Sequence, residues 1–232
     1  EFWGGAVNLK YVYLTHNFDD SLDWTNGWQG KAQFVYITHE DGNANRGIEG
    51  DSHKGATDTP VSKPKLANFT ILPGADIENA SGDKGEGILL RVATAGELYN
   101  VLVQGRKGNT STTESGECLE LDGSYAGLVD NVNNNTLTMS HSIIDCNEPF
   151  KYSSDNAATK DAINVETWFM GQEGNATTAV TLTDGMPATT DAALIGTGKD
   201  LSTDDNFFEA TNFIGAFDGQ NDWRQGWAYF PQ

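Results

Sequence analysis

Hydrophobic and β-branched residues gather in short segments that repeat along the chain. Residues 10–16 (Lys-Tyr-Val-Tyr-Leu-Thr-His) and 33–39 (Gln-Phe-Val-Tyr-Ile-Thr-His) match closely at an offset of 23 residues. A parallel β-solenoid advances by one coil in roughly that length and stacks equivalent side chains about 4.8 Å apart. The spacing therefore predicts three side-chain ladders between successive coils: Val12 on Val35, Leu14 on Ile37, and Thr15 on Thr38.

A second pair of similar segments, 66–71 and 98–103, repeats at an offset of 32 residues. Solenoid coils often differ in the length of their loops, so this longer offset still fits successive coils. Shorter apolar stretches lie between these segments and are expected to form the other strands of the same coils: 47–51, 87–91 and 118–122. We expect a further strand over 136–146. A Greek-key sandwich would also explain the alternation, but not near-identical strands at one-coil spacing.

The pattern changes after residue 153, where apolar side chains fall at helical spacing: Ala158, Ala162, Val165 and Phe169. Ser154 or Asp155 would begin an amphipathic helix and Gly171 would end it. This helix, over 154–170, is expected on the side of the solenoid or over its C-terminal end. Residues 174–205 indicate irregular structure with short strands, and 207–230 indicate a docked aromatic segment.

Together these patterns predict an all-β fold, a right-handed parallel β-helix. Its coils would occupy residues 1–150, with the helix and the irregular segment over 151–232 packed on the same domain. A length of 232 residues suits one domain, and 26 glycines favour strands and turns over a helical protein. The fold prediction is therefore a single solenoid.

Charge excludes two classes of partner. Lys and Arg number 14 against 33 Asp and Glu, a net charge of -19 that repels nucleic acid and anionic membrane surfaces. No apolar run approaches the roughly 18 residues of a membrane span, and no signal peptide begins the chain. We expect neither a nucleic-acid partner nor a membrane span.

Two cysteines, Cys118 and Cys146, lie 28 residues apart, close to the length of one coil. An even cysteine count in a chain with an extracellular composition predicts one disulfide, which would link adjacent coils. The alternative is a pair of buried thiols.

An eleven-residue motif occurs at both ends of the chain, over 18–28 and 217–227. The two copies share six identical positions and contain four of the six tryptophans. Their acidic residues are candidate calcium ligands or, alternatively, turn caps: Asp19, Asp20, Asp23, Asp218 and Asp222. Their indole rings are candidate platforms for sugars or, alternatively, packing between a loop and the solenoid: Trp24, Trp28, Trp223 and Trp227. Apart from calcium, no cofactor is expected.

Two histidines at equivalent positions, His16 and His39, are expected to stack on adjacent coils. With Asp19 and Glu40 they would bind a transition metal, or they simply form a ladder of surface side chains. The sequence contains no glycine-rich phosphate loop, Cys-x-x-Cys motif or Gly-x-Ser-x-Gly motif.

Several segments carry a family resemblance: 1–11, 19–24, 30–34, 46–51, 207–208, 213–217 and 222–227. They resemble a largely uncharacterised family of secreted bacterial right-handed parallel β-helix proteins, and this chain resembles a C-terminal half of one. The resemblance implies the fold and export from the cell, and no established activity. By similarity to polysaccharide lyases built on β-helices, the candidate bases are Arg46, Lys54 and Arg91, with carboxylate partners Glu49, Asp51 and Glu120; their spacing is not diagnostic.

The predicted function is that of a non-catalytic secreted structural or adhesive module at the bacterial surface. Open solenoid ends would let it associate end to end into extracellular filaments. The alternative is a carbohydrate-active protein, either a glycan-binding module or a polysaccharide lyase, that uses the solenoid groove. A concave groove that joins perturbed basic and acidic residues would favour the enzyme, whereas flat faces and open ends covered by a partner would favour the scaffold.

Overall fold

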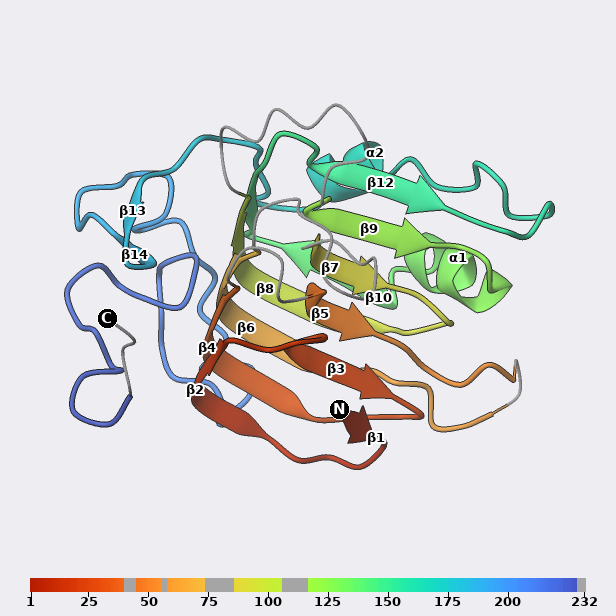
Figure 1. Ribbon diagram of the computed structural model, residues 1–232, viewed down its shortest axis with the longest axis horizontal. Helices are drawn as coiled ribbons and strands as arrows, with labels where there is room; N and C mark the ends of the chain where they lie inside the picture. The colour runs from red at the N-terminus through yellow and green to blue at the C-terminus, as the bar shows by residue number, and fades with distance from the viewer. Residues whose placement is uncertain (40–44, 56–57, 74–85, 106–116, 229–232) are drawn as a thin grey trace.

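The computed structural model describes residues 1–39, 45–55, 58–73, 86–105 and 117–228. Two parallel sheets face each other across the core (Figure 1). Sheet A contains β1 (Phe2–Trp3), β3 (Leu22–Thr25), β5 (Arg46–Gly50), β7 (Glu86–Leu90), β9 (Leu119–Asp122) and β12 (Phe150–Ser153). Sheet B contains β2 (Leu9–Thr15), β4 (Lys31–Thr38), β6 (Lys65–Leu72), β8 (Gly96–Gln104), β10 (Leu137–Ser140) and β11 (Ile143–Asp145). The chain alternates between the sheets and builds an all-β solenoid.

The registers confirm the ladders predicted from the repeats. In the pairing of β2 with β4, Val12 lies beside Val35, Leu14 beside Ile37 and Thr15 beside Thr38. The second repeat pairs in the same way, with Leu66 beside Leu98 and Ile71 beside Val103. Between the sheets, fully buried side chains from both layers form one continuous core. Burial of these apolar ladders is the main stabilising term of the fold.

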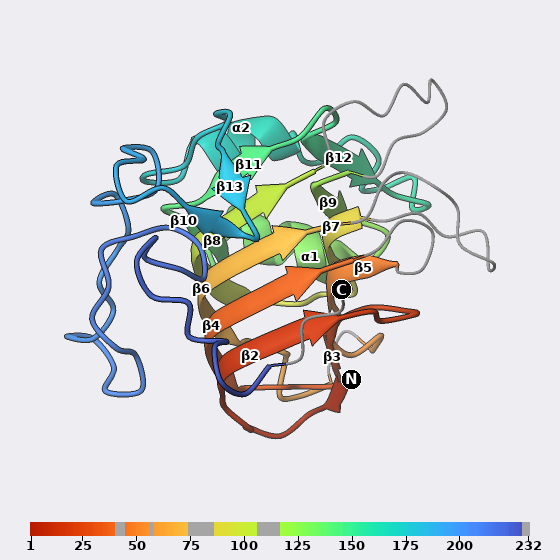
Figure 2. The ribbon, with the colours of Figure 1, turned by 60° about the vertical axis from the view of Figure 1, so that its left-hand side comes forward.

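Each long strand of sheet B contains one residue with a left-handed backbone at an equivalent position. These residues are Tyr11, Phe34, Asn68 and Asn100, with φ between 55° and 59°. Asn adopts this conformation more readily than most residues. Asn68 Nδ2 donates to the Phe213 carbonyl at 2.9 Å, and Asn100 Oδ1 accepts from the Lys199 amide at 2.8 Å. These amides hold the C-terminal segment beside sheet B, as its blue trace shows (Figure 2).

The helix prediction was wrong in two respects. Residues 154–164 form turns, and the helix α2 covers only Val165–Met170, where Asn164 Oδ1 accepts from the Thr167 amide at 2.8 Å. Ser154 follows directly on β12, which pairs with β9, and the chain then turns before the helix begins. A helix that the pattern did not indicate, α1 (Ala126–Asn133), buries Leu128 and Val132. Tertiary packing, rather than helical propensity, forms both short helices.

The remaining elements refine the other predictions. The strand expected over 136–146 is divided into β10 and β11, because His141 has a φ of 50°. Within 174–205 a short antiparallel hairpin forms from β13 (Leu182–Thr183) and β14 (Met186–Pro187), as the sequence indicated. None of the helices in the described part of the chain has the length and apolar character needed to cross a membrane.

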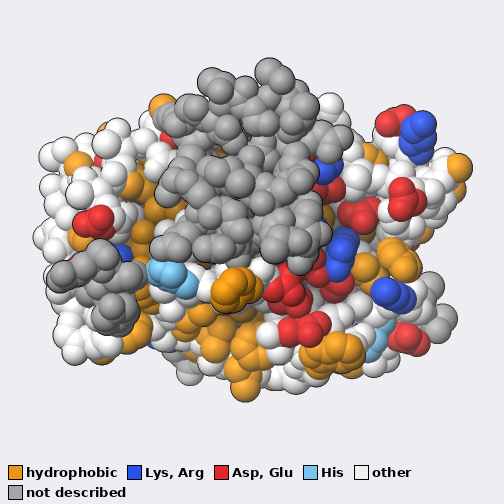
Figure 3. Space-filling model, viewed as in Figure 1, with side chains coloured by type: hydrophobic (Ala, Val, Ile, Leu, Met, Phe, Trp, Pro, Cys, Tyr) orange, Lys and Arg blue, Asp and Glu red, His pale blue; other side chains and the backbone are white. Residues whose placement is uncertain are grey.

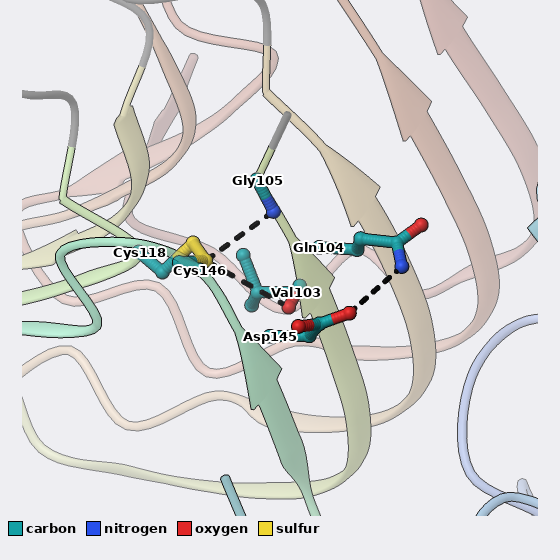
Figure 4. Close-up of a disulfide and its surroundings, with 6 residues drawn as sticks. All are labelled: Val103, Gln104, Gly105, Cys118, Asp145 and Cys146. Atoms are coloured by element: carbon teal, nitrogen blue, oxygen red, sulfur yellow. Dashed lines mark hydrogen bonds between the residues drawn. A yellow bond between two sulfur atoms is a disulfide. The ribbon is translucent and has the colours of Figure 1, made fainter. Parts of the chain in front are cut away.

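The predicted disulfide is present. Cys118, just before β9, is bonded to Cys146, just after β11, with their Cα atoms 6.3 Å apart (Figure 4). Next to it, the Gly105 amide donates to the Cys146 sulfur at 3.3 Å and Gln104 Nε2 donates to Asp145 Oδ2 at 2.9 Å. Because β11 pairs with β8 in the preceding coil, the bond links adjacent coils at the corner between the two sheets.

Candidate functional site

The outer face of sheet A carries a row of ionisable side chains. Neighbouring positions on five successive strands are occupied by Asp23, Glu49, Leu89, Glu120 and Lys151, and all of these except Leu89 are ionisable. Along β3, Asp23 lies between Leu22 and Trp24, which are buried in the core, so Asp23 points away from it. Figure 3 shows acidic and basic side chains gathered over these strands. The row places opposite charges close together on one face.

Two arginines hold the carboxylates of this face. Arg46 Nε donates to Glu86 Oε2 and Arg46 Nη1 to Glu49 Oε1, each at 2.9 Å. Arg91 Nε donates to Asp51 Oδ1 at 2.7 Å, and Arg91 Nη2 donates to the second Glu49 oxygen. Glu49 therefore bridges both guanidinium groups, and we call this set of five residues the sheet A network.

The carboxylates raise the pKa of both arginines. Burial alone would lower the pKa of Arg46, but Glu86, Asp20 and Glu49 reverse the effect. Asp51 and Glu49 do the same for Arg91. A guanidinium in this setting stays charged, so these arginines can donate hydrogen bonds but are not suited to abstract a proton. Lys54, the third candidate base, is exposed, and its positive charge acts to lower the pKa of Asp51.

Burial raises the pKa of the acidic groups on the same face. The pKa of Asp23 is about 7, with burial as the largest cause and the charges of nearby carboxylates adding to it. The pKa of Glu49 is also about 7, again chiefly through burial, with the arginines opposing the shift. The pKa of Asp20 is about 6 for the same first reason. Carboxyl groups whose pKa is raised toward neutral pH are suited to exchange protons near pH 7.

Only two of the five predicted calcium ligands come together. Asp20 and Asp23 join Glu49, and their ligand oxygens lie within 4.8 Å of one another. Asp19 is exposed beside them. The motif does not contain Glu49. Because Glu49 lies one coil after Asp23, stacking of the coils places the two residues side by side. A second acidic group, Glu86, Glu117 and Glu120, has the same closeness, and Lys151 pairs with Glu117 and Glu120 at 3.2 Å.

The second copy of the motif follows the turn-capping alternative. Asp218 Oδ1 accepts from the Gln220 and Asn221 amides at 2.8 Å and 2.7 Å. Asp222 Oδ1 accepts from the Arg224 amide at 3.0 Å and from Arg224 Nε at 2.8 Å. Both carboxylates stabilise the local turn, and neither belongs to the sheet A network.

The two copies also differ in their tryptophans. Trp24 and Trp28 are fully buried, with indole nitrogens that donate to Thr94 Oγ1 and to the Val7 carbonyl. Neither ring offers a face to a sugar, because the first copy contains strand β3 and contributes to the core. Trp223 and Trp227 stack at 6.0 Å, and Trp227 is 58% exposed. The second copy alone presents an indole ring to solvent.

The two histidines make separate contacts. His16 is exposed and bonds Thr15, whereas His39 is 4% exposed and contacts Ser21 Oγ through Nε2 at 2.6 Å. Glu40 lies outside the described residues. Burial of His39 lowers its pKa to about 4, so its imidazole is neutral near pH 7.

Residues 1–228 match the family model of the Pectate-lyase like beta helix domain. The chain belongs to this family. Membership confirms the predicted β-helix family and fits the two stacked parallel sheets. No curated protein and no solved structure matches the chain.

In this pectate-lyase-like domain, Asp23→Asn is expected to change the pH dependence of stability. The pKa of Asp23 rises from 3.8 to about 7 on folding, so the native state binds more protons than the unfolded state between these values. The contribution of Asp23 to stability is complete below pH 4 and is lost as the pH rises through 7. Urea unfolding should show Asp23→Asn gaining stability relative to the wild type between pH 5 and pH 8.

The matched control is Asp155→Asn, which removes an exposed carboxylate after β12. Its difference from the wild type should stay constant over the same range. The contribution of His39 to stability has the opposite pH dependence, because its pKa is lowered on folding. Both proteins contain His39, so this contribution cancels in the comparison. Parallel stability curves for the wild type and Asp23→Asn would contradict the raised pKa.

Proposed function

We propose that the protein is a carbohydrate-active solenoid that binds a polysaccharide chain along the outer face of sheet A. One observation carries the proposal: Asp23 and Glu49, each with a pKa of about 7, are neighbours on one solenoid face, and Glu49 pairs with two guanidinium groups. Family membership supports the same substrate class. Perturbed acidic groups gathered with cations are typical of functional sites.

The side chains divide into two roles. Arg91, whose side chain is 33% exposed, is the cation available to bind hydroxyl or carboxylate oxygens of a sugar. Arg46, at 18% exposure, fixes Glu49 in position. Asp23 makes no ion pair with these arginines, and it accepts a proton above its pKa of about 7 and donates one below it. Proton transfer therefore falls to a carboxyl group, and binding falls to Arg91.

The experiment is a calorimetric titration of the wild type with a panel of neutral and anionic polysaccharides. Binding to one class is expected, with affinity about tenfold or more lower in Glu49→Gln, because Arg91 loses the charged carboxylate that orients it. Asp155→Asn should bind like the wild type. Equal affinities of wild type and folded Glu49→Gln, or no binding across the panel, would contradict the proposal.

We extend the proposal to calcium at Asp20, Asp23 and Glu49. Calcium takes six to eight oxygen ligands, and these three carboxylates supply hard oxygens within 4.8 Å of one another. A bound cation would relieve their repulsion and would bridge an anionic polysaccharide to this acidic face. Calcium should raise the melting temperature of the wild type but not of Asp23→Asn; an equal response of both proteins would oppose it.

The second candidate function is the secreted structural or adhesive module that self-associates end to end. Its supporting observation is the exposure of Trp3 and Phe18, at 71% and 84%, near the edge strands β1 and β2. We place it at the bacterial cell surface and propose a right-handed coil, the usual hand of parallel crossovers. Sedimentation should show association that Trp3→Ser weakens; a monomer at high concentration would exclude it.

A further inference from the structure

A groove crosses the ends of four strands of sheet B. It consists of two hollows of about 460 Å³ and 1000 Å³, which share Thr38, His39 and Thr181 in their linings. One wall takes a residue from the end of each strand in turn: Thr15, Thr38, Leu72 and Gln104. Three coil steps of about 4.8 Å make this wall about 14 Å long. A groove of that length along the solenoid axis suits a chain ligand.

The opposite wall comes from the C-terminal part of the chain. It includes the β13–β14 hairpin and residues near Arg224. Five threonines contribute hydroxyl groups to the polar lining: Thr15, Thr38, Thr181, Thr183 and Thr190. Three carboxylates, Asp184, Asp191 and Asp222, also line it, and Asp222 pairs with Arg224. This excess of negative charge disfavours an anionic ligand and suits a neutral one that is rich in hydroxyl groups.

His39 provides a hydrogen-bond acceptor that the protein leaves unused. Ser21 Oγ donates to Asn17 Oδ1 at 3.1 Å, and an amide oxygen only accepts. Ser21 therefore has no second proton for His39, so His39 Nε2 carries the proton and donates to Ser21 Oγ at 2.6 Å. His39 Nδ1 then holds a lone pair, and it is buried with no hydrogen-bond partner among the described residues. An unpaired buried acceptor is costly unless a ligand satisfies it.

We propose that this groove binds a neutral saccharide chain, one hydroxyl group of which donates a hydrogen bond to His39 Nδ1. The ligand class rests on the proposed carbohydrate function, but the site is separate from the sheet A network. Stacking of Tyr13 on Tyr36, with ring centroids 5.2 Å apart, stiffens the floor of the groove at the ends of β2 and β4. The groove therefore adds a neutral subsite to the charged face of sheet A.

The test is a titration with cellohexaose, xylohexaose and mannohexaose, with hexagalacturonate as the anionic comparison, followed by ¹⁵N NMR of the histidine rings. The free protein should show His39 protonated at Nε2. A neutral hexamer should shift the His39 Nδ1 resonance, and Thr38→Val and Thr181→Val should each weaken its binding at least fivefold. Thr177→Val, at an exposed threonine outside the groove, should bind like the wild type.

The outcomes separate this site from the sheet A network. Binding of a neutral hexamer that survives Glu49→Gln but is weakened by Thr38→Val supports the groove. Binding that is abolished by Glu49→Gln, with no movement of the His39 resonance, overturns the groove and leaves the sheet A proposal standing. No binding of any neutral hexamer at millimolar concentration also overturns it. The threonine variants replace a hydroxyl group by a methyl group, so their folding is checked separately by the midpoint of urea unfolding.

Discussion

Replacing Trp28 by alanine should lower the free energy of unfolding by about 3–5 kcal/mol, the usual cost of deleting a buried tryptophan side chain. Trp28 is fully buried, stacks on Phe2 with ring centroids 4.9 Å apart and lies 5.7 Å from Trp24. Its removal leaves a cavity in the first coils that these rings line. Because whole domains are stable by only about 5–15 kcal/mol, urea unfolding should show a large shift of the midpoint.

The internal repeat supplies the matched control. Trp227 occupies the equivalent position in the second copy of the motif but is 58% exposed. Trp227→Ala should cost less than about 1 kcal/mol, since it removes only the stacking on Trp223 and an exposed hydrogen bond from Trp227 Nε1 to the Trp223 carbonyl. Equal losses in the two variants would contradict the assignment of one copy to the core and the other to the surface.

Arg46→Met should lower the free energy of unfolding by about 3–5 kcal/mol, because it leaves the paired carboxylates without their cation. Arg46 contacts Glu49 and Glu86 at 2.9 Å and Asp20 at 3.9 Å, and its side chain is 18% exposed. The loss of stability should be greater at pH 8, where Asp20 and Glu49 are charged, than at pH 5, where their raised pKa keeps them protonated. Urea unfolding at both pH values measures the difference.

A double variant distinguishes the charge effect from lost packing. Glu86→Gln removes one carboxylate that Arg46 neutralises, so it should cost less in the Arg46→Met background than in the wild type. Additive losses, together with a loss that does not change with pH, would show that Arg46 acts through packing alone. In that case the network would not hold the charges of sheet A together.

The strands of sheet B could be predicted because their side chains repeat at coil spacing. Val12 and Val35 are identical residues at equivalent positions of successive repeats, as are Leu66 and Leu98. Stacking of coils places such residues side by side. The spacing of Cys118 and Cys146 led to the disulfide for the same reason. Periodicity carries this information because each coil must bury the same face.

Other features depend on tertiary contacts that no local pattern contains. Residues 154–164 have apolar side chains at helical spacing, yet β12 ends at Ser153 and the chain turns before α2 begins. The helix α1 contains several weak helix formers and has no acidic residue in its first turn. It forms because Leu128 and Val132 are buried. Similarly, nothing in the two motif copies tells which pair of tryptophans is buried.

The sheet A network was only partly accessible from the sequence. Arg46, Glu49, Asp51 and Arg91 were each candidate residues, but their mutual contacts depend on coils with loops of different lengths. The offset from Asp23 to Glu49 differs from that of the first strand repeat, so their pairing requires the sheet A register. The raised pKa of Asp23 likewise follows from burial, which composition does not give.

The most direct test of the central claim is a crystal structure with an oligosaccharide from the polysaccharide that binds most tightly. The account predicts sugar density over β3, β5 and β7, with sugar oxygens in contact with Arg91 and with Asp23 or Glu49. The neutral groove would then appear as a second region of density beside His39. A saturating oligosaccharide bound away from sheet A, with the network unchanged, would contradict the assignment of this face as the polysaccharide site.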